Sequence, residues 1–295
     1  GGVMEHLKDR VAVVTGGASG IGRSLALAFG SEGVKVIVAD VDEMGMAETV
    51  AAIKQRRGEA LAVRADVSVL EDVQALADQA QAAFGRIHIL CNNAGVGVWG
   101  GLETATYRDW QWVMGVNLWS VIHGLLAFLP RMIAQREGGH IVNTASMAGL
   151  IASQGLGIYN TTKYAVVGLS ETLVKDLRPY NIGVSVLCPM GVRTRIRESE
   201  RNRPEPLRNP GQQMKSEPVE LMGRTLTPDE VAARVLAAIR ENQLYVITHE
   251  EGLEPLRRRF QRMEQAIRSQ GSPDQASRAS ATHSTTASPI AHPLT

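Results

Sequence analysis

A tyrosine and a lysine four residues apart are the side chains whose types and spacing most directly indicate chemistry. Tyr159 precedes Lys163, and none of the other four tyrosines has a lysine at this distance. In a helix this spacing places both side chains on one face. A free phenol has a pKa of about 10, and an ammonium at ~4 Å supplies roughly the energy that lowers it by about three pH units. The pair predicts a general acid–base, although a half-buried tyrosine beside a solvent-facing lysine would show the same spacing.

Two further polar side chains could complete a reacting centre around this pair. Ser146 lies 13 residues before Tyr159 at the end of an apolar run, where its hydroxyl could hydrogen-bond a substrate oxygen. Asn117 lies in a long helical segment, and its amide could hold a water that links Lys163 to solvent. The alternative for Asn117 is a polar residue on a buried helix. The predicted catalytic residues are Asn117, Ser146, Tyr159 and Lys163.

A glycine-rich turn joins the first apolar run to a helical segment. Residues 15–22 read TGGASGIG, and glycine lets the backbone turn sharply and approach a ligand. A helix that starts there offers free N–H groups and a positive dipole end to a pyrophosphate. The glycine spacing differs from the G-x-G-x-x-G dinucleotide fingerprint, and a glycine cluster alone is weak evidence. The predicted cofactor contacts in this turn are Gly16, Ser19, Gly20, Ile21 and Gly22.

An acid ends the second apolar run, 20 residues beyond Gly20. Asp40 could accept hydrogen bonds from an adenosine ribose diol. A 2′-phosphate at ~4 Å would repel it by roughly 4 kcal/mol per charge pair, and no Lys or Arg lies within 36–43 to offset this. Arg23, inside the first helical segment, is a minor objection. We therefore expect NAD rather than NADP. The alternative, that Asp40 only caps the next helix, is weakened because Asp42 could serve that role.

Three further strand ends supply the remaining predicted cofactor contacts. Asp66-Val67 could hold the adenine edge, although a turn or helix-cap aspartate would fit there as well. Small and amide residues at 92–95 suit close cofactor approach, and a plain turn would also explain them. The segment that begins at Pro189, after the sixth apolar run, could bind the nicotinamide carboxamide. The contacts are Asp66, Val67, Asn93, Ala94, Gly95, Pro189, Val192 and Thr194, together with Tyr159 and Lys163.

These motifs fall between short apolar runs and longer amphipathic segments that alternate along the chain. The predicted strands are 11–15, 35–40, 60–66, 86–91, 139–146, 183–189 and 244–248. Helical segments are predicted at 20–31, 43–57, 69–84, 106–136 and 158–178. Nearly continuous apolar strands are typical of parallel strands covered on both faces. The pattern predicts an α/β, Rossmann-like, doubly wound parallel sheet of about seven strands in three α/β/α layers, with ligands at the carboxyl ends of the strands.

Composition places this fold in one catalytic domain. We expect the domain at 5–268, a substrate lid at 191–226, which is rich in Arg, Glu and Pro, and a disordered tail at 269–295. A net charge of +1 gives no global field for nucleic acid or an anionic membrane, and no long uncharged apolar stretch suggests a membrane span. Cys91 and Cys188 lie in apolar runs, which predicts core residues, no metal site and a cytoplasmic location.

The full ordered set of motifs resembles the short-chain dehydrogenase/reductase family, from about residue 7 to 250. The resemblance implies that Tyr159 is the general acid–base, Ser146 stabilises the substrate oxygen, and Asn117 holds a relay water. It also implies that Lys163 lowers the tyrosine pKa and binds the nicotinamide ribose. The family usually has Pro-Gly where this chain has Pro189-Met190, so the Met190 side chain is expected to intrude on the substrate or nicotinamide side of the pocket. Residues 241–261 are similar to bacterial enzymes that oxidise benzylic alcohols of lignin-derived aryl ethers.

The expected activity is the interconversion of a bulky or aromatic secondary alcohol and its ketone. The side chains expected around the substrate are mostly large and apolar, although several could be ordinary core residues. They are Trp99, Met147, Gln154 and Met190, with Val96, Leu150 and Leu156 nearby. Arginines in the lid (Arg193, Arg195 and Arg197) could meet an anionic substrate, but a solvated lid explains them better. The alternatives are an NADP-dependent ketoacyl or carbonyl reductase, a lyase or dehalogenase on the same scaffold, and a non-catalytic dinucleotide-binding protein.

An excess of apolar side chains on two helical segments predicts self-association. Segments 106–136 and 158–178 carry more of them than one sheet face is expected to bury. The residues concerned are Trp110, Trp119, Leu126, Phe128, Leu169 and Leu173. In the family that the chain resembles, these helices pair across a two-fold axis, so we expect a homodimer or homotetramer.

Overall fold

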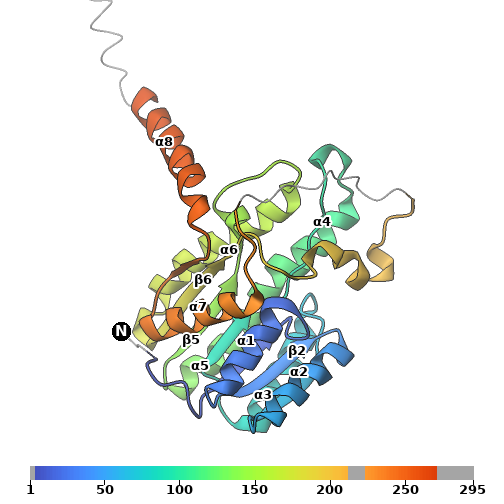
Figure 1. Ribbon diagram of the computed structural model, residues 1–295, viewed down its shortest axis with the longest axis vertical. Coiled ribbons are helices and arrows are strands. Elements are labelled where there is room, and N and C mark those ends of the chain that lie inside the picture. Colours follow the sequence, from blue (N-terminus) through green and yellow to red (C-terminus); the bar gives the residue numbers. More distant parts are fainter. Residues whose placement is uncertain (1–3, 212–222, 271–295) are drawn as a thin grey trace, which may run out of the picture. The chain divides into compact units, whose positions relative to one another are not determined.

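Seven parallel strands form one sheet in the order β3-β2-β1-β4-β5-β6-β7 (Figure 1). The computed structural model describes residues 4–211 and 223–270. The strands are β1 Val11–Thr15, β2 Lys35–Asp40, β3 Ala60–Arg64, β4 Ile89–Asn92, β5 Gly139–Thr144, β6 Ile182–Cys188 and β7 Tyr245–Ile247. The order reverses between β1 and β4, so a crevice opens at the carboxyl ends of these two strands. All seven predicted strands are confirmed: the bounds of β1 and β2 are as predicted, and the ends of the others differ by at most three residues.

Helices cover both faces of the sheet, which confirms the three-layer prediction. The helices are α1 Gly20–Ser31, α2 Glu43–Gln55, α3 Leu70–Phe84, α4 Tyr107–Met114, α5 Ser120–Gln135, α6 Gly157–Asp176 and α7 Pro228–Glu241. Helix α1 packs against α7 and α2 on one face, and α3 packs against α5 on the other (Figure 1). A π-helical turn, Gly115–Trp119, joins α4 to α5. The predicted segment 106–136 is therefore one helical run with a π-helical turn that contains Asn117.

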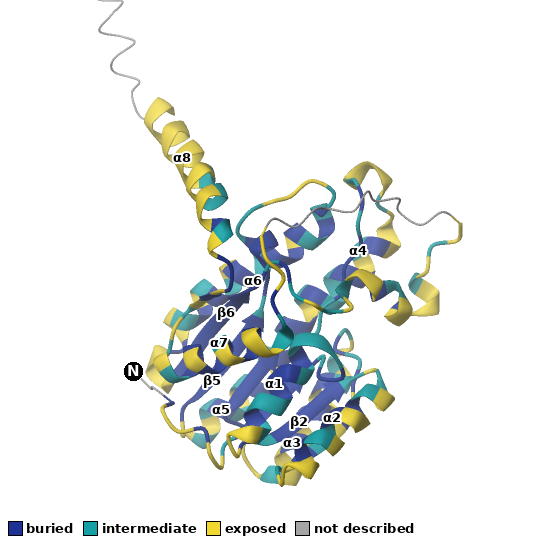
Figure 2. Cartoon of the chain, in the orientation of Figure 1, coloured by how far each residue is buried: buried dark blue, intermediate teal, exposed yellow. Residues whose placement is uncertain are grey.

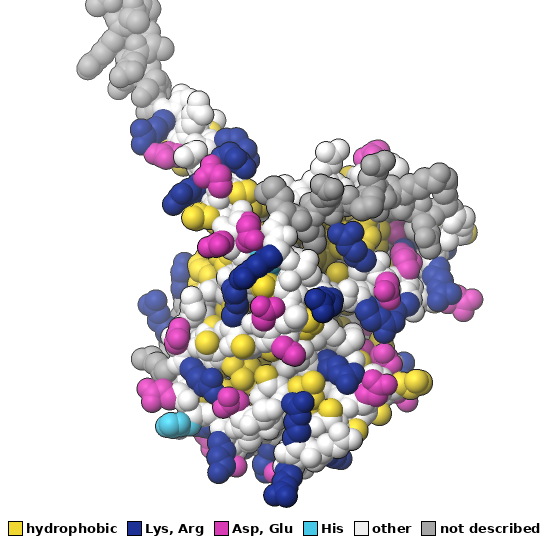
Figure 3. Space-filling view, in the orientation of Figure 1, with side chains coloured by type: hydrophobic (Ala, Val, Ile, Leu, Met, Phe, Trp, Pro, Cys, Tyr) yellow, Lys and Arg dark blue, Asp and Glu magenta, His cyan; other side chains and the backbone are white. Residues whose placement is uncertain are grey.

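The core consists of the strands and the inner faces of these helices. Side chains of the five central strands are buried almost throughout, the edge strands β3 and β7 also carry exposed side chains, and the helices bury one side and expose the other (Figure 2). Two apolar clusters lie on opposite faces of the sheet, one around Leu25 and Phe29 and the other around Phe128 and Ile141. Acidic and basic side chains are interspersed over the surface that Figure 3 shows, as expected for a net charge of +1.

The expected lid begins and ends on one short bridge. Val192 pairs with Leu226, the Arg193 N–H donates to the Leu226 carbonyl at 2.9 Å, and the Leu226 N–H donates to the Gly191 carbonyl at 2.9 Å. Between these ends lie a 3-10 segment, Ile196–Asn202, and a 3-10 turn, Glu205–Leu207. The remainder of the expected lid, 212–222, and nearly all of the expected tail lie outside the described residues.

Contacts divide the chain into one unit up to Glu251 and a second unit from Gly252. The described part of the second unit includes helix α8, Leu253–Gln270, which carries an ion pair between Glu254 and Arg258. The expected domain, 5–268, spans the first unit and most of α8.

The helical run Tyr107–Gln135 is long and apolar enough, by length and composition, to cross a membrane. Half of its apolar window is buried inside the protein, and α5 packs against α3 and β4. This is the arrangement of a helix that covers a sheet.

The six residues expected on an association surface differ in their burial. Trp110 and Leu169 are partly buried and pack against core clusters. Phe128 and Leu173 are buried in the core, so the expectation that they are left unburied was wrong. They point toward the sheet because the helix phase at these positions turns them inward. Trp119 and Leu126 stay exposed, at 49% and 57%.

Candidate active site

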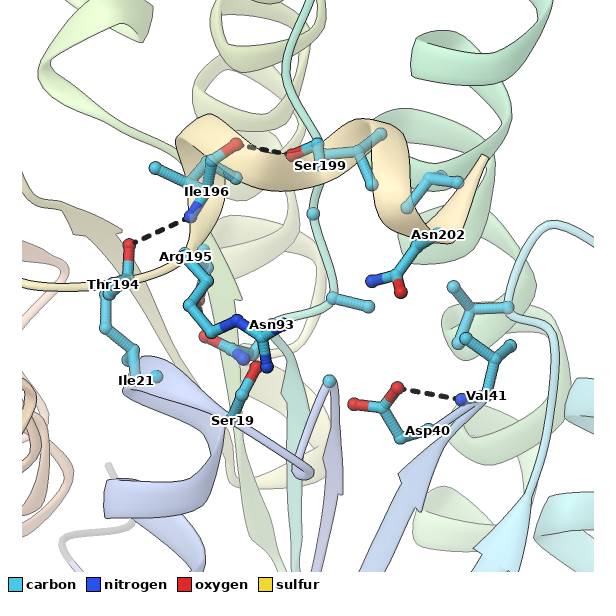
Figure 4. A pocket seen from close by; sticks show the side chains of 18 of the residues that line it. Ser19, Ile21, Asp40, Val41, Asn93, Thr194, Arg195, Ile196, Ser199 and Asn202 are labelled. Atoms are coloured by element: carbon cyan, nitrogen blue, oxygen red, sulfur yellow. Dashed lines mark hydrogen bonds between the residues drawn. The ribbon is translucent and has the colours of Figure 1, made fainter. Parts of the chain in front are cut away.

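A cavity of about 300 Å³ opens at the carboxyl ends of the central strands. Among the residues that the structure describes, every predicted cofactor contact except Gly22 lines it. Asp40 lines the cavity (Figure 4), and so do Tyr159, Lys163 and Ser146. Residues from many elements and loops therefore meet at one site, and those at strand ends do so as predicted.

Glycine is required in the turn that forms one wall of the cavity. Gly16 and Gly20 have φ of 67° and 54°, in the left-handed region that favours glycine. A Cβ on Gly22 would lie 2.1 Å from the Gly16 carbonyl oxygen, so Gly22 lets α1 pack against the turn rather than contact a ligand. The turn thus leaves the first N–H groups of α1 open to the cavity, which suits a pyrophosphate.

Asp40 is fixed at its end of the cavity by backbone donors. Its carboxylate accepts hydrogen bonds from the N–H groups of Ala18, Val41 and Asp42, at 3.0, 2.8 and 3.1 Å. Asp42 caps α2 by accepting from the Gly45 N–H, so this helix cap does not depend on Asp40. Arg23 pairs with Glu48.

Two other predicted cofactor residues, Asp66 and Asn93, are held by hydrogen bonds of different kinds. Asp66 accepts from the Ser68 N–H and hydroxyl at 2.9 and 2.6 Å, so one of its oxygens serves the turn. Asn93 is fixed between strands: its side-chain N–H donates to the Thr15 carbonyl at 3.1 Å, and its side-chain oxygen accepts from the Thr144 hydroxyl at 3.2 Å.

Tyr159 and Lys163 share one face of α6, as the spacing predicts. The Lys163 ammonium nitrogen lies 5.4 Å from the Tyr159 ring centroid and donates to the Thr144 carbonyl at 2.9 Å. Lys163 is 2% exposed. A buried lysine with one carbonyl partner at the edge of a cavity is placed to donate further hydrogen bonds to a ligand there.

Burial governs the proton affinity of both groups. Burial raises the pKa of Tyr159 to about 12, and a hydrogen bond from Ser146 acts in the opposite direction. Burial lowers the pKa of Lys163 to about 8. The protein alone therefore does not lower the pKa of Tyr159, contrary to the expectation from its spacing with Lys163. The ammonium faces the ring and is itself destabilised by burial, so it does not offset the desolvation of the phenolate.

Ser146 and Asn117 differ in how directly they reach the cavity. The Ser146 hydroxyl donates to the Pro189 carbonyl at 3.3 Å and accepts from the Ala148 N–H at 3.1 Å, and Ser146 lines the cavity. The Asn117 amide is bound to the Val96 backbone, accepting at 2.8 Å and donating at 2.9 Å. A Cβ on Gly95 would lie 3.6 Å from the Asn117 side-chain oxygen and 3.7 Å from the Lys163 nitrogen, so glycine keeps a space open between them.

The expected substrate contacts are only partly brought together. Met190 lines the cavity, and the Trp99 and Tyr159 ring centroids are 5.6 Å apart. Trp99, Met147 and Gln154 are absent from the described residues that line it. Met147 is a buried core residue, because the 3-10 turn after β5 directs it into an apolar cluster with Val166. Gln154 is exposed in the loop before α6.

Sequence reasoning missed a set of residues that closes the cavity from above. From α4 these are Gln111 and Trp112; from the 191–211 segment they include Arg195, Ile196, Arg201 and Asn202. Figure 4 shows Arg195 extending toward Ser19 and Asn93, and Asn202 facing Asp40. The basic composition of this segment was a signal, but interpreting it as a solvated lid left no role for Arg195 or Arg201.

Comparisons with known proteins agree with this architecture. The family model described as short chain dehydrogenase matches residues 10–205. The chain is 36% identical over 263 residues to a C alpha-dehydrogenase of a Sphingobium species, which covers 88% of this chain and 86% of the relative. It is 33% identical over 259 residues to a CLA biosynthesis dehydrogenase/reductase of Lactiplantibacillus plantarum, covering 84% and 91%.

A solved structure is similar in both sequence and fold. It is a short chain dehydrogenase/reductase from Burkholderia phymatum in complex with NAD, 44% identical, with a TM-score of 0.85 over 88% of this chain and 96% of that chain. The glycine turn, the acid at the end of β2 and the buried lysine fit a nicotinamide dinucleotide. The chain is an oxidoreductase of the alcohol dehydrogenase type and belongs to the short-chain dehydrogenase family.

Proposed function

We propose that the protein is an NAD-dependent dehydrogenase that interconverts a bulky or aromatic secondary alcohol and its ketone. One observation carries this proposal: a single cavity is lined by Asp40 and by the group Ser146, Tyr159 and Lys163. A dinucleotide with its ribose on Asp40 would extend across the glycine turn toward Tyr159. A non-catalytic binding protein would have no use for this second group.

The four predicted catalytic residues divide the proton chemistry among them. When bound, the nicotinamide supplies the acceptor for the hydride that leaves the alcohol carbon. Tyr159 takes the hydroxyl proton through its phenolic oxygen, and Ser146 donates a hydrogen bond to the substrate oxygen. Lys163 stabilises the phenolate by its charge. The space above Gly95, between Asn117 and Lys163, suits a water that passes the proton on.

The preference for NAD over NADP rests on Asp40. Its carboxylate is held by backbone donors at the place where a ribose diol could reach it, and a 2′-phosphate there would be repelled. The similar Burkholderia phymatum protein was solved with NAD, which agrees with this preference.

The nature of the substrate follows from the apolar side chains near Tyr159. Trp99 stacks at a tilt beside the tyrosine ring, and Met190 lines the cavity where the family usually has glycine. A planar or bulky apolar group suits these neighbours. The name of the Sphingobium relative, C alpha-dehydrogenase, agrees with oxidation at one carbon of a larger molecule.

The exposed side chains of Trp119, in the π-helical turn, and Leu126, on α5, support self-association of this helical run with a second copy of the chain. We propose a homodimer or homotetramer that acts in the cytoplasm.

One observation favours a second candidate, an NADP-dependent reductase. Arg201 lines the cavity and lies close enough to Asp40 and Asp42 for their charges to raise its pKa, although burial and Arg195 lower it further. A guanidinium there could offset part of the repulsion of a 2′-phosphate.

Two measurements test the proposal. Fluorescence titration with NADH and NADPH should give a lower Kd for NADH, and tighter NADPH binding would favour the reductase instead. A screen of aryl and aliphatic secondary alcohols with NAD, followed by NADH absorbance, should then find turnover with bulky substrates. Absence of dinucleotide binding would overturn the assignment as a whole.

A further inference from the structure

The segment that covers the cavity, residues 195–203, is held in place by buried contacts; we call it the roof segment. The Arg203 side chain is 2% exposed, and one of its terminal nitrogens lies 2.7 Å from an oxygen of fully buried Asp109 in α4. Its guanidinium also lies 5.0 Å from the Trp112 ring centroid. The Ser199 hydroxyl accepts from the Gly97 N–H at 3.0 Å. Because these anchors join the roof segment to the body of the protein, its side chains are positioned before any ligand binds.

The roof segment places a positively charged side chain opposite the glycine turn. Arg195 lines the cavity and reaches from the roof segment toward Ser19 and Asn93 (Figure 4). Its Nε lies 3.2 Å from a Glu198 oxygen in an exposed pair, which holds one edge of the guanidinium. The opposite wall is the start of α1, whose first N–H groups and positive dipole end face the same space.

Like charges therefore converge on this part of the cavity. Arg201 also lines the cavity; burial and the charge of Arg195 lower its pKa, whereas the carboxylates of Glu198, Asp40 and Asp42 act in the opposite direction. The two guanidiniums repel each other, and an anion bound beside Arg195 and the start of α1 would relieve this repulsion. A doubly charged pyrophosphate matches this arrangement in charge and in its many acceptor oxygens.

We propose that Arg195 is an additional cofactor-binding residue, which pairs with the pyrophosphate from the roof side while the glycine turn holds it from below. This inference rests on the proposed dinucleotide-dependent function. It assigns a binding role to a segment that sequence reasoning treated as a solvated lid. The pyrophosphate is then held between two walls that the fold positions in advance.

The test compares Arg195→Gln with the wild type in titrations with NADH and with ADP-ribose, which carries the pyrophosphate but no nicotinamide. Both Kd values should rise by about tenfold, the loss expected for one charge-assisted contact. The difference should shrink at high salt, because the half-exposed guanidinium is screened. Arg195→Lys, which keeps the charge but loses the planar fork, should fall between the two.

Arg193→Gln is the matched control, since Arg193 is exposed and is not among the described residues that line the cavity. It should bind both ligands as the wild type does. Unchanged Kd values in a folded Arg195→Gln protein would overturn the inference, and so would an equal loss in Arg193→Gln. If the wild type bound neither ligand, the proposed function itself would fail, which is a different result.

Discussion

At the scale of single residues, burial favours the neutral forms of both Tyr159 and Lys163. It raises the pKa of the phenol to about 12 and lowers that of the ammonium to about 8. A phenolate that accepts a proton near neutrality therefore needs positive charge beyond what the protein provides. An oxidised nicotinamide carries such a charge, so we expect the tyrosine to become an effective base only once the cofactor is in place.

The depressed pKa of Lys163 predicts a specific dependence of stability on pH. Below pH 8 both the folded and the unfolded chain hold the proton, and burial of the ammonium costs stability. Between pH 8 and 10.5 the folded protein has released it while the unfolded chain retains it, so the free energy of unfolding rises with pH. Relative to Lys163→Met, the wild type should gain about 2 kcal/mol between pH 7.5 and 9.5 in urea denaturation. A constant difference between the two proteins would contradict this.

The charge of Asp40 predicts the effect of neutralising it. Asp40→Asn keeps an oxygen for the Val41 and Asp42 N–H groups, loses the acceptor for Ala18, and removes the repulsion toward a 2′-phosphate. The ratio of the NADPH Kd to the NADH Kd should fall by at least roughly tenfold in fluorescence titrations. Asp42→Asn is the control, because it makes the same change in net charge and Asn still caps α2 well. An equal fall in Asp42→Asn would show that the preference for NADH comes from the overall negative charge of this region and not from the Asp40 carboxylate.

At the scale of elements, the buried pair of Asp109 and Arg203 connects α4 to the roof segment. Burial alone would raise the pKa of Asp109, but hydrogen bonds from Thr106, Arg203 and Asn209 hold it below its usual value. The carboxylate is thus charged and fully paired. The pair joins residues 94 positions apart, which local sequence pattern could not reveal.

Breaking this pair should loosen the roof segment. Asp109→Asn leaves the buried Arg203 guanidinium with only the partly exposed Glu200 carboxylate as counter-charge, so the free energy of unfolding should fall by up to about 3 kcal/mol. NADH binding should weaken in the same variant, because Arg195 is no longer held over the glycine turn. The double variant Asp109→Asn/Arg203→Met should recover part of the stability in urea denaturation. If the double variant were less stable than Asp109→Asn, the ion pair would not be the interaction that couples Asp109 and Arg203.

The sequence predicted elements and strand-end residues well because both depend on local pattern. Apolar runs located the strands, and parallel strands necessarily bring Asp40, Asn93 and Ser146 to one edge. Met147 was misplaced because the direction of a side chain in a short turn depends on what packs around it. The roof segment was missed for a similar reason: the direction of Arg195 depends on anchors distant in the sequence.

At the scale of the whole molecule, exposed apolar side chains on the π-helical turn and α5 predict assembly. Trp119 and Leu126 are 49% and 57% exposed. Leu126→Glu would place a charge in the proposed interface, so light scattering should show a fall in mass from an oligomer toward the monomer. Met44→Glu on α2, where Met44 is 78% exposed, should leave the mass unchanged. A monomeric wild type at working concentration would remove the proposal.

The central claim is that Tyr159 exchanges the proton during hydride transfer to a dinucleotide bound in this cavity. The most direct test is the rate of NADH formation by Tyr159→Phe with an alcohol that the wild type oxidises. The variant should lose at least roughly a hundredfold in kcat while its Kd for NADH stays at the wild-type value, because only the phenolic oxygen is removed. Tyr159→Phe with wild-type turnover would contradict the account.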